Sequence, residues 1–409
     1  MASNTSTTPD WGLGKFLYDA KSSGFDITPP VISSATGARV RIGGEEFLNF
    51  ASCSLLGLHV YPGVLHTFQA AATDFGLATG GSRLIQGRLE PIEQLESLVA
   101  TSCDKEAAIT FASGLLANMG FTHTFGHSVQ ASSSLRLDLD KTIFVMDRDS
   151  HWSVQKSVEP MRRNRRVYRF RHNDMDHLSE ILRKLSGQQI IILFESIYSV
   201  DGSVAPIREI IRLAQEHGAL TYVDDANGYQ IYGSSTRPFY AEFQALNSVD
   251  FRMISFSKAV GVEGGAIASS AQNVEALEWL SGTSSFTATI LPPAAAAAMA
   301  AVGLIQGSPD LVDNYLAKCH DLRSRLAACG FQLNACASYI TNVMIGDDAV
   351  AEAVRREFLQ EKILVPVFRY PASPRGQAGL RLIPSALHTD EDISRFIETL
   401  VRLRGVYGF

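Results

Sequence analysis

The chain has 409 residues, of which 46% are apolar and 19% are charged, a balance that excludes a disordered protein. Lysine and arginine number 36 and aspartate and glutamate number 42, so the formal net charge is −6. An acidic chain lacks the positive field that phosphate backbones require, and we expect no nucleic acid partner. At roughly 150 residues per domain, the length predicts two or three domains, or one large domain with a smaller appendage.

The sequence indicates neither a membrane protein nor a disulfide-bonded one. The longest apolar run, 292–305, is too short to cross a bilayer, and the polar first ten residues lack the apolar core of a signal peptide. The five cysteines are scattered and never form a CxxC pair, which favours reduced thiols over disulfides or zinc. We therefore expect a cytoplasmic protein with no membrane contact and no bound metal.

In chain order, the predicted elements begin with a polar arm over residues 1–36. Two short strands, 39–42 and 47–50, and a helix at 62–75 follow. Apolar runs typical of strands come next, at 107–111, 142–146, 167–170, 190–194, 219–223, 251–254 and 265–268. Amphipathic helices such as 176–185 and 206–217 separate many of them. This alternation predicts right-handed crossovers and a largely parallel sheet.

The remaining segments complete an α/β chain with a smaller C-terminal α+β domain. The Ser-rich stretch 128–140 is predicted to be a surface loop, and Pro292–Pro293 to open an Ala-rich helix that runs on to a long linker helix at 311–328. After it we expect strands at 339–345, 364–368 and 380–383 and helices at 349–361 and 390–403. The predicted units are an N-terminal arm with a small strand unit (1–50), a large domain (51–300), and the linker helix with the small domain (301–409).

Ligands of open parallel sheets bind where the strands end, so the exit loops carry the functional signal. Ser113, Gly114 and Leu115 follow the first strand and open a helix, which suits either a phosphate cradle or an ordinary turn. His151 follows the second strand and could stack on a bound ring or simply cap its loop. The loop from Glu195 to Gly202 carries acids and hydroxyls that could be turn chemistry alone.

Two further exits add an acid and an amine. Asp224 ends an apolar strand, where an acid is costly to bury unless a cation meets it; Asp225 is interpreted as its solvated twin. Lys258 lies between apolar strands and is either a surface residue or a desolvated amine able to form a Schiff base. Each signal alone is weak. A phosphate cradle, a ring-stacking histidine, an acid and a lysine together fit pyridoxal phosphate (PLP).

Ordered motifs along most of the chain, from about Phe47 to His388, resemble the α-oxoamine synthase family of fold type I PLP enzymes. The matching stretches are Gly81–Gly87, Leu95-Glu96, Phe111–Gly114, Ala117-Asn118, His172–Asp174, Glu195–Gly202, Ala205-Pro206, Val223–Ala226, Phe256–Ala259, Thr289–Pro293 and Ser385–Thr389. The resemblance implies a mostly parallel seven-stranded sheet flanked by helices. It makes residues 51–300 the PLP-binding domain.

The resemblance also implies roles for single residues. Lys258 would be the imine lysine and remove the Cα proton, Asp224 would pair with the pyridinium nitrogen, and His151 would stack on the ring. The cofactor would further be bound by Ser113, Gly114, Leu115, Ser199, Asn227, Ser255 and Ser257, and Thr289 would reach the phosphate in the neighbouring subunit. Substrate would be bound by Arg369, which suits a carboxylate by bidentate geometry, and by Arg83 and Cys53.

The reaction implied is a decarboxylative or Claisen-type condensation of an amino acid with an acyl thioester, and for this chain we expect the decarboxylative form, giving an α-amino ketone. The thioester would be carried by coenzyme A or by an acyl carrier protein, and the enzyme would be a homodimer with shared active sites. The resemblance thus implies a transferase that acts in biosynthesis.

Three positions depart from the family pattern. Asn227 stands where the family has a histidine near the cofactor O3′, and Asn227 can donate a hydrogen bond there but cannot act as acid or base. Cys53 and its two neighbours replace an Asn-Asp-Tyr triplet, and Ala372 replaces a threonine. The alternatives left open are therefore another PLP reaction, such as an aminotransferase, decarboxylase or aldol-type lyase, and a non-catalytic partner subunit of an active homologue.

Six arginines crowd the stretch 162–171. Charge runs are usually solvated, and we favour a solvated helix-to-strand connection. The alternative is a landing site for coenzyme A phosphates or an acidic carrier protein.

Overall fold

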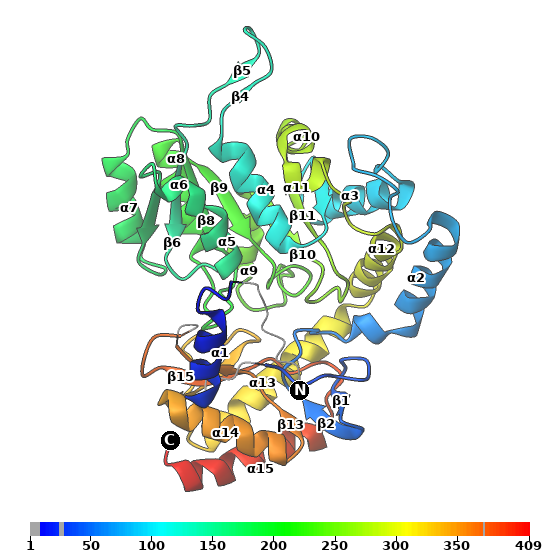
Figure 1. The fold of residues 1–409 in the computed structure, drawn as a ribbon, viewed down its shortest axis with the longest axis vertical. Coiled ribbons are helices and arrows are strands. Elements are labelled where there is room, and N and C mark those ends of the chain that lie inside the picture. Colours follow the sequence, from blue (N-terminus) through cyan, green and yellow to red (C-terminus); the bar gives the residue numbers. More distant parts are fainter. Residues whose placement is uncertain (1–8, 24–27, 371–372) are drawn as a thin grey trace.

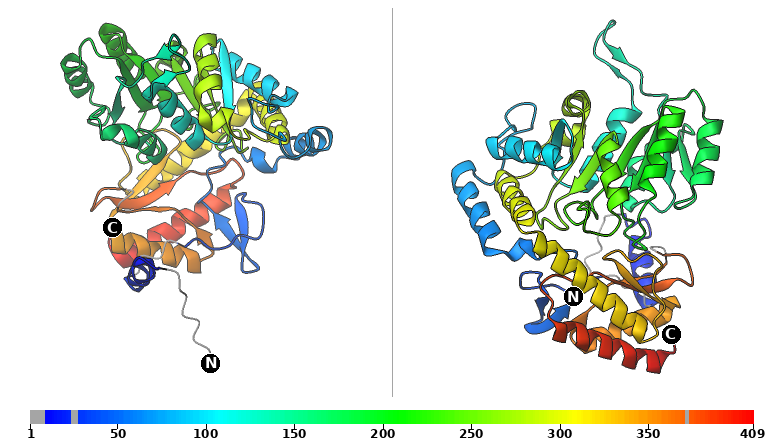
Figure 2. Two further views of the ribbon diagram at one scale, coloured as in Figure 1. Left: turned by 45° about the horizontal axis from the view of Figure 1, so that its top comes forward. Right: turned by 180° about the vertical axis from the view of Figure 1, so that it is seen from behind.

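The computed structural model describes residues 9–23, 28–370 and 373–409. Figure 1 shows a larger body built around a central sheet and a smaller one that contains the C-terminus. Helix α13 (Pro309–Ala328) runs from the larger body into the smaller one, which is clearest in the right-hand view of Figure 2.

The large domain is organised by a seven-stranded sheet with the order β3-β11-β10-β9-β8-β6-β7. Strand β11 runs antiparallel to both of its neighbours, and the other neighbouring pairs are parallel. The sequence prediction of a mostly parallel sheet is therefore confirmed. The strands are β3 (Ala107–Phe111), β6 (Ile143–Asp147), β7 (Val167–Phe170), β8 (Ile190–Glu195), β9 (Leu220–Asp224), β10 (Phe251–Ser255) and β11 (Gly265–Ser269).

Helices cover both faces of this sheet (Figure 1), as a parallel sheet requires because both its faces are apolar. Helix α8 (Ile207–His217) shows the rule: its isoleucines and Ala214 form one buried stripe, as their spacing predicts. The other helices of this domain are η1 (Leu58–Val60), α2 (Pro62–Phe75), α3 (Glu90–Ser102), α4 (Gly114–Gly126), α5 (Trp152–Ser157), α6 (Glu159–Arg162), α7 (Met175–Lys184), α9 (Tyr240–Ala245), η2 (Leu246–Ser248), α10 (Ala271–Leu280), α11 (Gly282–Ser285) and α12 (Pro292–Gly307).

Helix α12 begins at Pro292 as predicted, and most of its alanines are buried. The prediction that it runs on into the linker helix is wrong, because the chain breaks at Ser308 and α13 leaves at an angle of 81°. In the described part of the chain no single helix is long and apolar enough to span a membrane, and only this bent pair passes such a test jointly.

The small domain packs two helices, α14 (Asp348–Gln360) and α15 (Asp390–Tyr407), on an antiparallel sheet of order β12-β15-β14. Its strands are β12 (Thr341–Gly346), β14 (Val367–Phe368) and β15 (Ala378–Leu382). Helix α15 starts in a capping box, in which the Thr389 and Asp392 side chains each accept a hydrogen bond from the other residue's backbone N–H.

The predicted strand 364–368 is in fact two strands in different sheets. Strand β13 (Ile363–Leu364) pairs with β2 (Glu45–Asn49), which forms a hairpin with β1 (Arg39–Ile42), whereas β14 pairs with β15. The N-terminal strand pair is therefore hydrogen-bonded to the C-terminal part of the chain.

Two segments that the sequence left without regular structure contain some. The predicted loop 128–140 is an arm with a short hairpin, β4 (Val129–Gln130) and β5 (Arg136–Leu137), that projects away from the large domain (Figures 1 and 2). The predicted N-terminal arm contains helix α1 (Leu13–Ser22), which has no buried residue.

Candidate active site

The predicted site residues meet at the carboxyl ends of the central strands. Asp224 is the last residue of β9 and pairs in register with Glu195, the last residue of β8. Ser255 ends β10 beside them, and Lys258 follows three residues later. The strand ends supply the positions and the short exit loops supply the functional groups, as expected for an open parallel sheet.

Lys258 is held by the residue that departs from the family pattern. Its Nζ lies 2.9 Å from Oδ1 of Asn227, and the Tyr339 hydroxyl donates to the same oxygen at 3.1 Å. The Asn227 amide nitrogen donates to the backbone oxygen of Ile197 at 3.0 Å, which fixes the amide orientation. Among the described residues no carboxylate forms an ion pair with Lys258, so its amine is available to a ligand carbonyl.

Asp224 is buried and held at both carboxylate oxygens. Asn118 donates to Oδ2 at 3.0 Å, and the Ala226 backbone N–H donates to Oδ1 at 3.1 Å. Asn118 is itself oriented by the Tyr222 hydroxyl at 2.6 Å. A carboxylate fixed in this way, with no cation paired to it in the described chain, suits the protonated nitrogen of a ring.

The interpretation of Asp225 as a solvated residue is wrong. Its side chain is fully buried, and Oδ2 accepts hydrogen bonds from Nε and Nη2 of Arg252 at 2.9 and 2.6 Å. Ser196 donates to the other carboxylate oxygen at 2.5 Å. The adjacent acids thus differ in role, since Asp225 closes a buried ion pair and Asp224 faces the site.

His151 is the N-cap of α5, and its backbone N–H donates to the Glu195 carboxylate. Its ring Nδ1 lies 2.7 Å from the Ser153 hydroxyl. Burial lowers the pKa of His151, the positive charges of Lys258 and Arg381 lower it further, and Asp224 opposes them. All three charges therefore act on one imidazole, which is neutral at pH 7 and suited to stacking on a ring.

The start of α4 supplies the expected anion cradle. Ser113 is its N-cap and accepts a hydrogen bond from the Leu116 N–H at 3.3 Å, while the N–H groups of Gly114 and Leu115 belong to the first turn, where no intrahelical acceptor exists. The floor of this cradle is close-packed, because a Cβ at Gly265 would lie 2.9 Å from the Gly114 nitrogen. The hydroxyls of Ser255 and Ser257 lie 2.8 Å apart nearby.

These residues fit PLP. An amine with no carboxylate partner among the described residues, a fixed carboxylate, a neutral imidazole and a helix N-terminus occur together. They match the carbonyl, the ring nitrogen, the ring face and the phosphate of the cofactor. In the described residues no cluster of three metal-ligating side chains competes for this role.

Sequence reasoning missed one residue at this site, Arg381 of β15. Its Nη1 donates to the Ser199 backbone oxygen at 3.0 Å, Nη2 lies 4.0 Å from the Cys53 sulfur, and the guanidinium lies 4.2 Å from the centre of the Phe368 ring. Burial lowers its pKa, and no described acidic residue pairs with it. An arginine inside the buried strand 378–382 was the signal that could have revealed it.

The predicted substrate residues are only partly brought together. Cys53 lies beside Arg381, as described above. Arg369 lies 3.5 Å from the Glu352 carboxylate of α14 (Nη1–Oε2), and its role as the carboxylate clamp stays a prediction. Ala372, the third departure from the family, lies outside the described residues.

Arg83 is engaged by acidic residues of its own chain, and its predicted substrate-binding role stays a prediction. Its guanidinium is buried and forms a bidentate pair with Glu96, with both distances 2.8 Å, while Nε bonds Glu278 at 3.1 Å. Glu96 also accepts from the Thr110 N–H and hydroxyl, and the Thr110 oxygen accepts from the Thr289 hydroxyl at 3.0 Å. Arg83 therefore belongs to a structural network, and the role of Thr289 in a neighbouring subunit stays a prediction.

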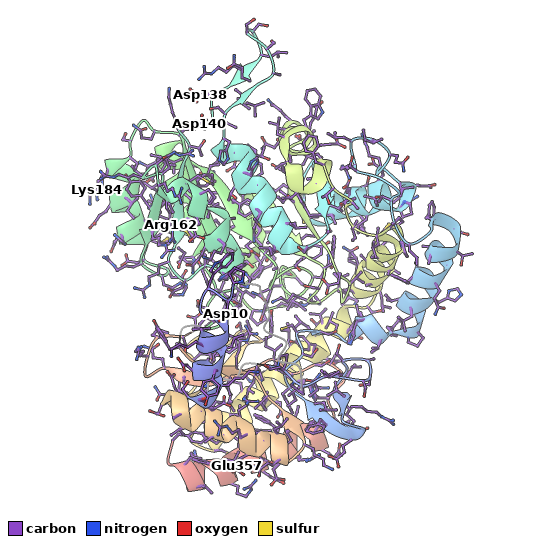
Figure 3. The ribbon with its side chains drawn as sticks, in the orientation of Figure 1. Asp10, Asp138, Asp140, Arg162, Lys184 and Glu357 are labelled. Carbon is purple, nitrogen blue, oxygen red and sulfur yellow. The ribbon has the colours of Figure 1, made fainter. Side chains whose placement is uncertain are left out.

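The arginine-rich stretch is divided between core and surface. Arg166 is buried and donates to the backbone oxygen of Gly126 at 2.9 Å, and Arg171 pairs with Asp174. Arg162 lies on the flank of the large domain, and Asp138 and Asp140 lie at the base of the projecting arm (Figure 3). The other arginines of the stretch are exposed, which fits the solvated interpretation, and the landing-site alternative stays a prediction.

A seven-stranded sheet with these residues at its strand ends defines a fold type I PLP-dependent enzyme. The family model for class I and II aminotransferases matches residues 52–400. The 8-amino-7-oxononanoate synthase of Thermoanaerobacter pseudethanolicus is 30% identical over 393 residues, 95% of each chain, and that of Fervidobacterium nodosum is 30% identical over 382 residues, 92% of this chain and 93% of the relative.

Solved structures agree with these sequence relatives. A serine palmitoyltransferase with PLP superposes with a TM-score of 0.86 at 26% identity, covering 98% of both chains. The serine palmitoyltransferase of Sphingomonas wittichii also has a TM-score of 0.86, at 25% identity, covering 100% of this chain and 99% of the other. The chain belongs to the α-oxoamine synthases, PLP-dependent C-acyltransferases within the class I and II aminotransferase family.

Proposed function

We propose that this enzyme condenses an amino acid with an acyl thioester at the site around Lys258, with Arg381 receiving the amino acid carboxylate. The observation that carries the residue assignment is the buried guanidinium of Arg381, which has no described acidic partner. Its charge acts on His151 together with the charges of Asp224 and Lys258. A buried cation of this kind is costly unless an anion pairs with it, and a substrate carboxylate supplies that anion.

When bound, PLP supplies a carbonyl for the amino acid and an electron sink for the Cα. The protein has four tasks beside it. Lys258 moves a proton at Cα, from a position fixed by Asn227. Asp224 holds the proton on the ring nitrogen, His151 covers the ring face, and the first turn of α4 binds the phosphate.

Asn227 sets the limits of this chemistry. Its amide accepts from Lys258 and Tyr339 and cannot itself transfer a proton. We therefore assign proton transfer at Cα to Lys258, while the Nδ1 atom of His151 keeps its hydrogen bond with Ser153. This is compatible with condensation, in which a single base removes the Cα proton before the thioester is attacked.

A direct test follows amino acid exchange in deuterated water with the PLP-loaded enzyme. We expect exchange of the Cα proton with the correct amino acid alone, and an α-amino ketone detected by mass only when an acyl thioester is added. Lys258→Ala should abolish both. Conversion of PLP to its pyridoxamine form would indicate an aminotransferase instead, and failure of the wild-type protein to bind PLP would indicate a non-catalytic subunit.

We also propose a homodimer that completes the site. Loop 80–87, the start of α4 and the segment 283–291 touch one another, because Leu84 N–H bonds the Ser285 oxygen and the Thr283 hydroxyl bonds the Leu116 oxygen. These segments expose a group of large apolar side chains: Leu84, Ile85, Leu115, Met119 and Phe286. An apolar surface beside an active site suits a subunit interface.

Sedimentation of paired variants tests the dimer. Ile85→Asp with Phe286→Asp should yield monomers with weakened PLP binding. Val406→Asp, which places the same charge on an exposed side chain of α15, should leave the dimer intact. A monomeric wild-type protein with full activity would contradict the proposal.

A further inference from the structure

One loop of the large domain is bound to the small domain through its backbone. We call the segment Tyr198–Ser203 the clasp loop. Four successive carbonyls of this loop accept hydrogen bonds from four small-domain side chains. The pairs are Ser199 with Arg381 (3.0 Å), Val200 with Asn342, Asp201 with Asn334 (2.7 Å) and Gly202 with Ser338 (2.7 Å).

The close approach at Gly202 depends on its lack of a side chain. Its φ is +71°, and a Cβ there would lie 2.8 Å from the Ser338 hydroxyl and 2.9 Å from the Ile340 oxygen. Only glycine adopts this conformation at low cost and lets the second domain come so near. The clasp loop is therefore shaped for this contact.

The other side of the clasp loop is fixed by His172 of the large domain. Its Nε2 lies 2.8 Å from the Ser203 hydroxyl and 3.4 Å from the Asp201 carboxylate. Its Nδ1 lies 3.0 Å from the Asp147 carboxylate, and its ring packs edge-on against Tyr198 at 4.4 Å between centroids. One imidazole thus contacts both ends of the loop.

The anchor beneath His172 is rigid. Asp147 ends β6, is fully buried, and accepts hydrogen bonds from the N–H groups of Asn173 and Asp149, both at 2.9 Å. Hydrogen bonds to Asp147 and Asp201 raise the pKa of His172 to about 10, against the effect of burial. The ring is therefore a cation at neutral pH, and its bonds to carboxylates are charge-assisted.

We propose that His172 is a positioning residue for the amino acid substrate: it fixes the clasp loop, and through the Ser199 carbonyl the loop fixes the guanidinium of Arg381. The inference rests on the proposed function in taking Arg381 as the carboxylate site. Within the described residues, His172 forms no hydrogen bond with Arg381 or Lys258. Its effect is on the orientation of Arg381, where a displacement of about 1 Å lowers the efficiency of the reaction.

The first test compares His172→Ala and His172→Gln in the PLP-loaded enzyme, with His66→Gln, on the exposed face of α2, as the matched control. We expect the amino acid KM to rise about tenfold for alanine and less for glutamine, which keeps one hydrogen bond, with kcat within about threefold. The thioester KM and the PLP absorbance should not change. An unaltered amino acid KM, or a loss confined to kcat, would overturn the proposal.

A second measurement does not require condensation. Binding of the amino acid alone, followed by the absorbance change of bound PLP, should weaken in the same order, and amide hydrogen exchange over 198–203 should accelerate. If the wild-type enzyme forms no amino ketone but these changes appear, the clasp assignment stands and the proposed function fails. If condensation occurs and neither change appears, the clasp assignment fails alone.

A variant on the small-domain side of the clasp loop tests the proposal if His172→Ala does not fold. Ser338→Ala removes the hydrogen bond to the Gly202 carbonyl and should also raise the amino acid KM. Combined with His172→Gln, the two effects should not add, because both act through the same loop. Fully additive effects would mean that the two residues work independently.

Discussion

The amide oxygen of Asn227 accepts hydrogen bonds from both Lys258 (2.9 Å) and Tyr339 (3.1 Å). Lys258 belongs to the large domain, whereas Tyr339 lies two residues before the small-domain strand β12. The amine of Lys258, which would bind the carbonyl of PLP, is therefore oriented by an uncharged group that also contacts the second domain. A neutral acceptor orients the amine without adding a charge beside it.

Replacing Asn227 by alanine should slow the Cα exchange reaction about tenfold, because Lys258 loses the acceptor that sets its rotamer. Asn227→His, which restores the residue usual in the family, should recover part of the rate. Exchange is measured by NMR in deuterated water with the amino acid alone. Equal rates in all three proteins would show that Asn227 does not orient the lysine.

Arg381→Ala should raise the KM for the amino acid by more than tenfold, since a charge-assisted bidentate contact is lost. The KM of Arg381→Lys should lie between those of the wild type and the alanine variant, because an ammonium keeps the charge but cannot form the paired hydrogen bonds. Arg212→Ala, on the exposed face of α8, is the matched control. Arg369→Ala decides which arginine binds the carboxylate. A larger rise in the amino acid KM for Arg369→Ala than for Arg381→Ala would show that Arg369, the residue predicted from the sequence, is the carboxylate clamp.

Thermal stability should fall as the pH rises from about 7 to 10. The folded-state pKa of His172 is raised to about 10 from its ordinary value of 6.5, so its contribution to stability is complete below about pH 6.5 and is lost through this window. The groups that face it are Asp147, Asp149, Asp201 and Tyr198. The difference in melting temperature between the wild type and His172→Gln isolates the effect, and it should shrink towards pH 10. A constant difference would contradict the assignment.

Arg83→Ala should destabilise the fold by about 3–5 kcal/mol, because Glu96 would be left as a buried charge without its partner. Arg88→Ala, which removes an exposed ion pair with Glu93, should cost less than about 1 kcal/mol. Urea unfolding of both variants measures the contrast. If Arg83→Ala instead raised a substrate KM at unchanged stability, the substrate role predicted from the sequence would be right.

The sequence predicted the central strands to within about a residue, because each is an apolar run bounded by polar loops. It also brought Asp224, His151 and Lys258 to one edge, because parallel strands end together. The sequence did not predict contacts between segments that are far apart along the chain. Nothing local to Arg83 indicates that Glu96 and Glu278 surround it, and nothing in 364–368 shows that its two halves join different sheets.

The functional misses have the same physical origin. Arg381 is flanked by apolar residues of its own strand. Its role depends on contacts with Ser199 and Cys53, which are far away in sequence. Asp225 was assigned to solvent because its partner, Arg252, follows 27 positions later on the adjacent strand. The role of a buried charged residue depends on its partner, and the fold topology, not the spacing in the sequence, determines which residue that partner is.

The pairing of β2 with β13 has a consequence for biosynthesis. The outer edge of the β1–β2 hairpin stays unpaired until residues 363–364, more than 300 positions later in the chain, have been synthesised. During that interval an open strand edge is exposed in the nascent chain. Moving the hairpin to the C-terminus by circular permutation would remove this delay and should reduce aggregation during synthesis.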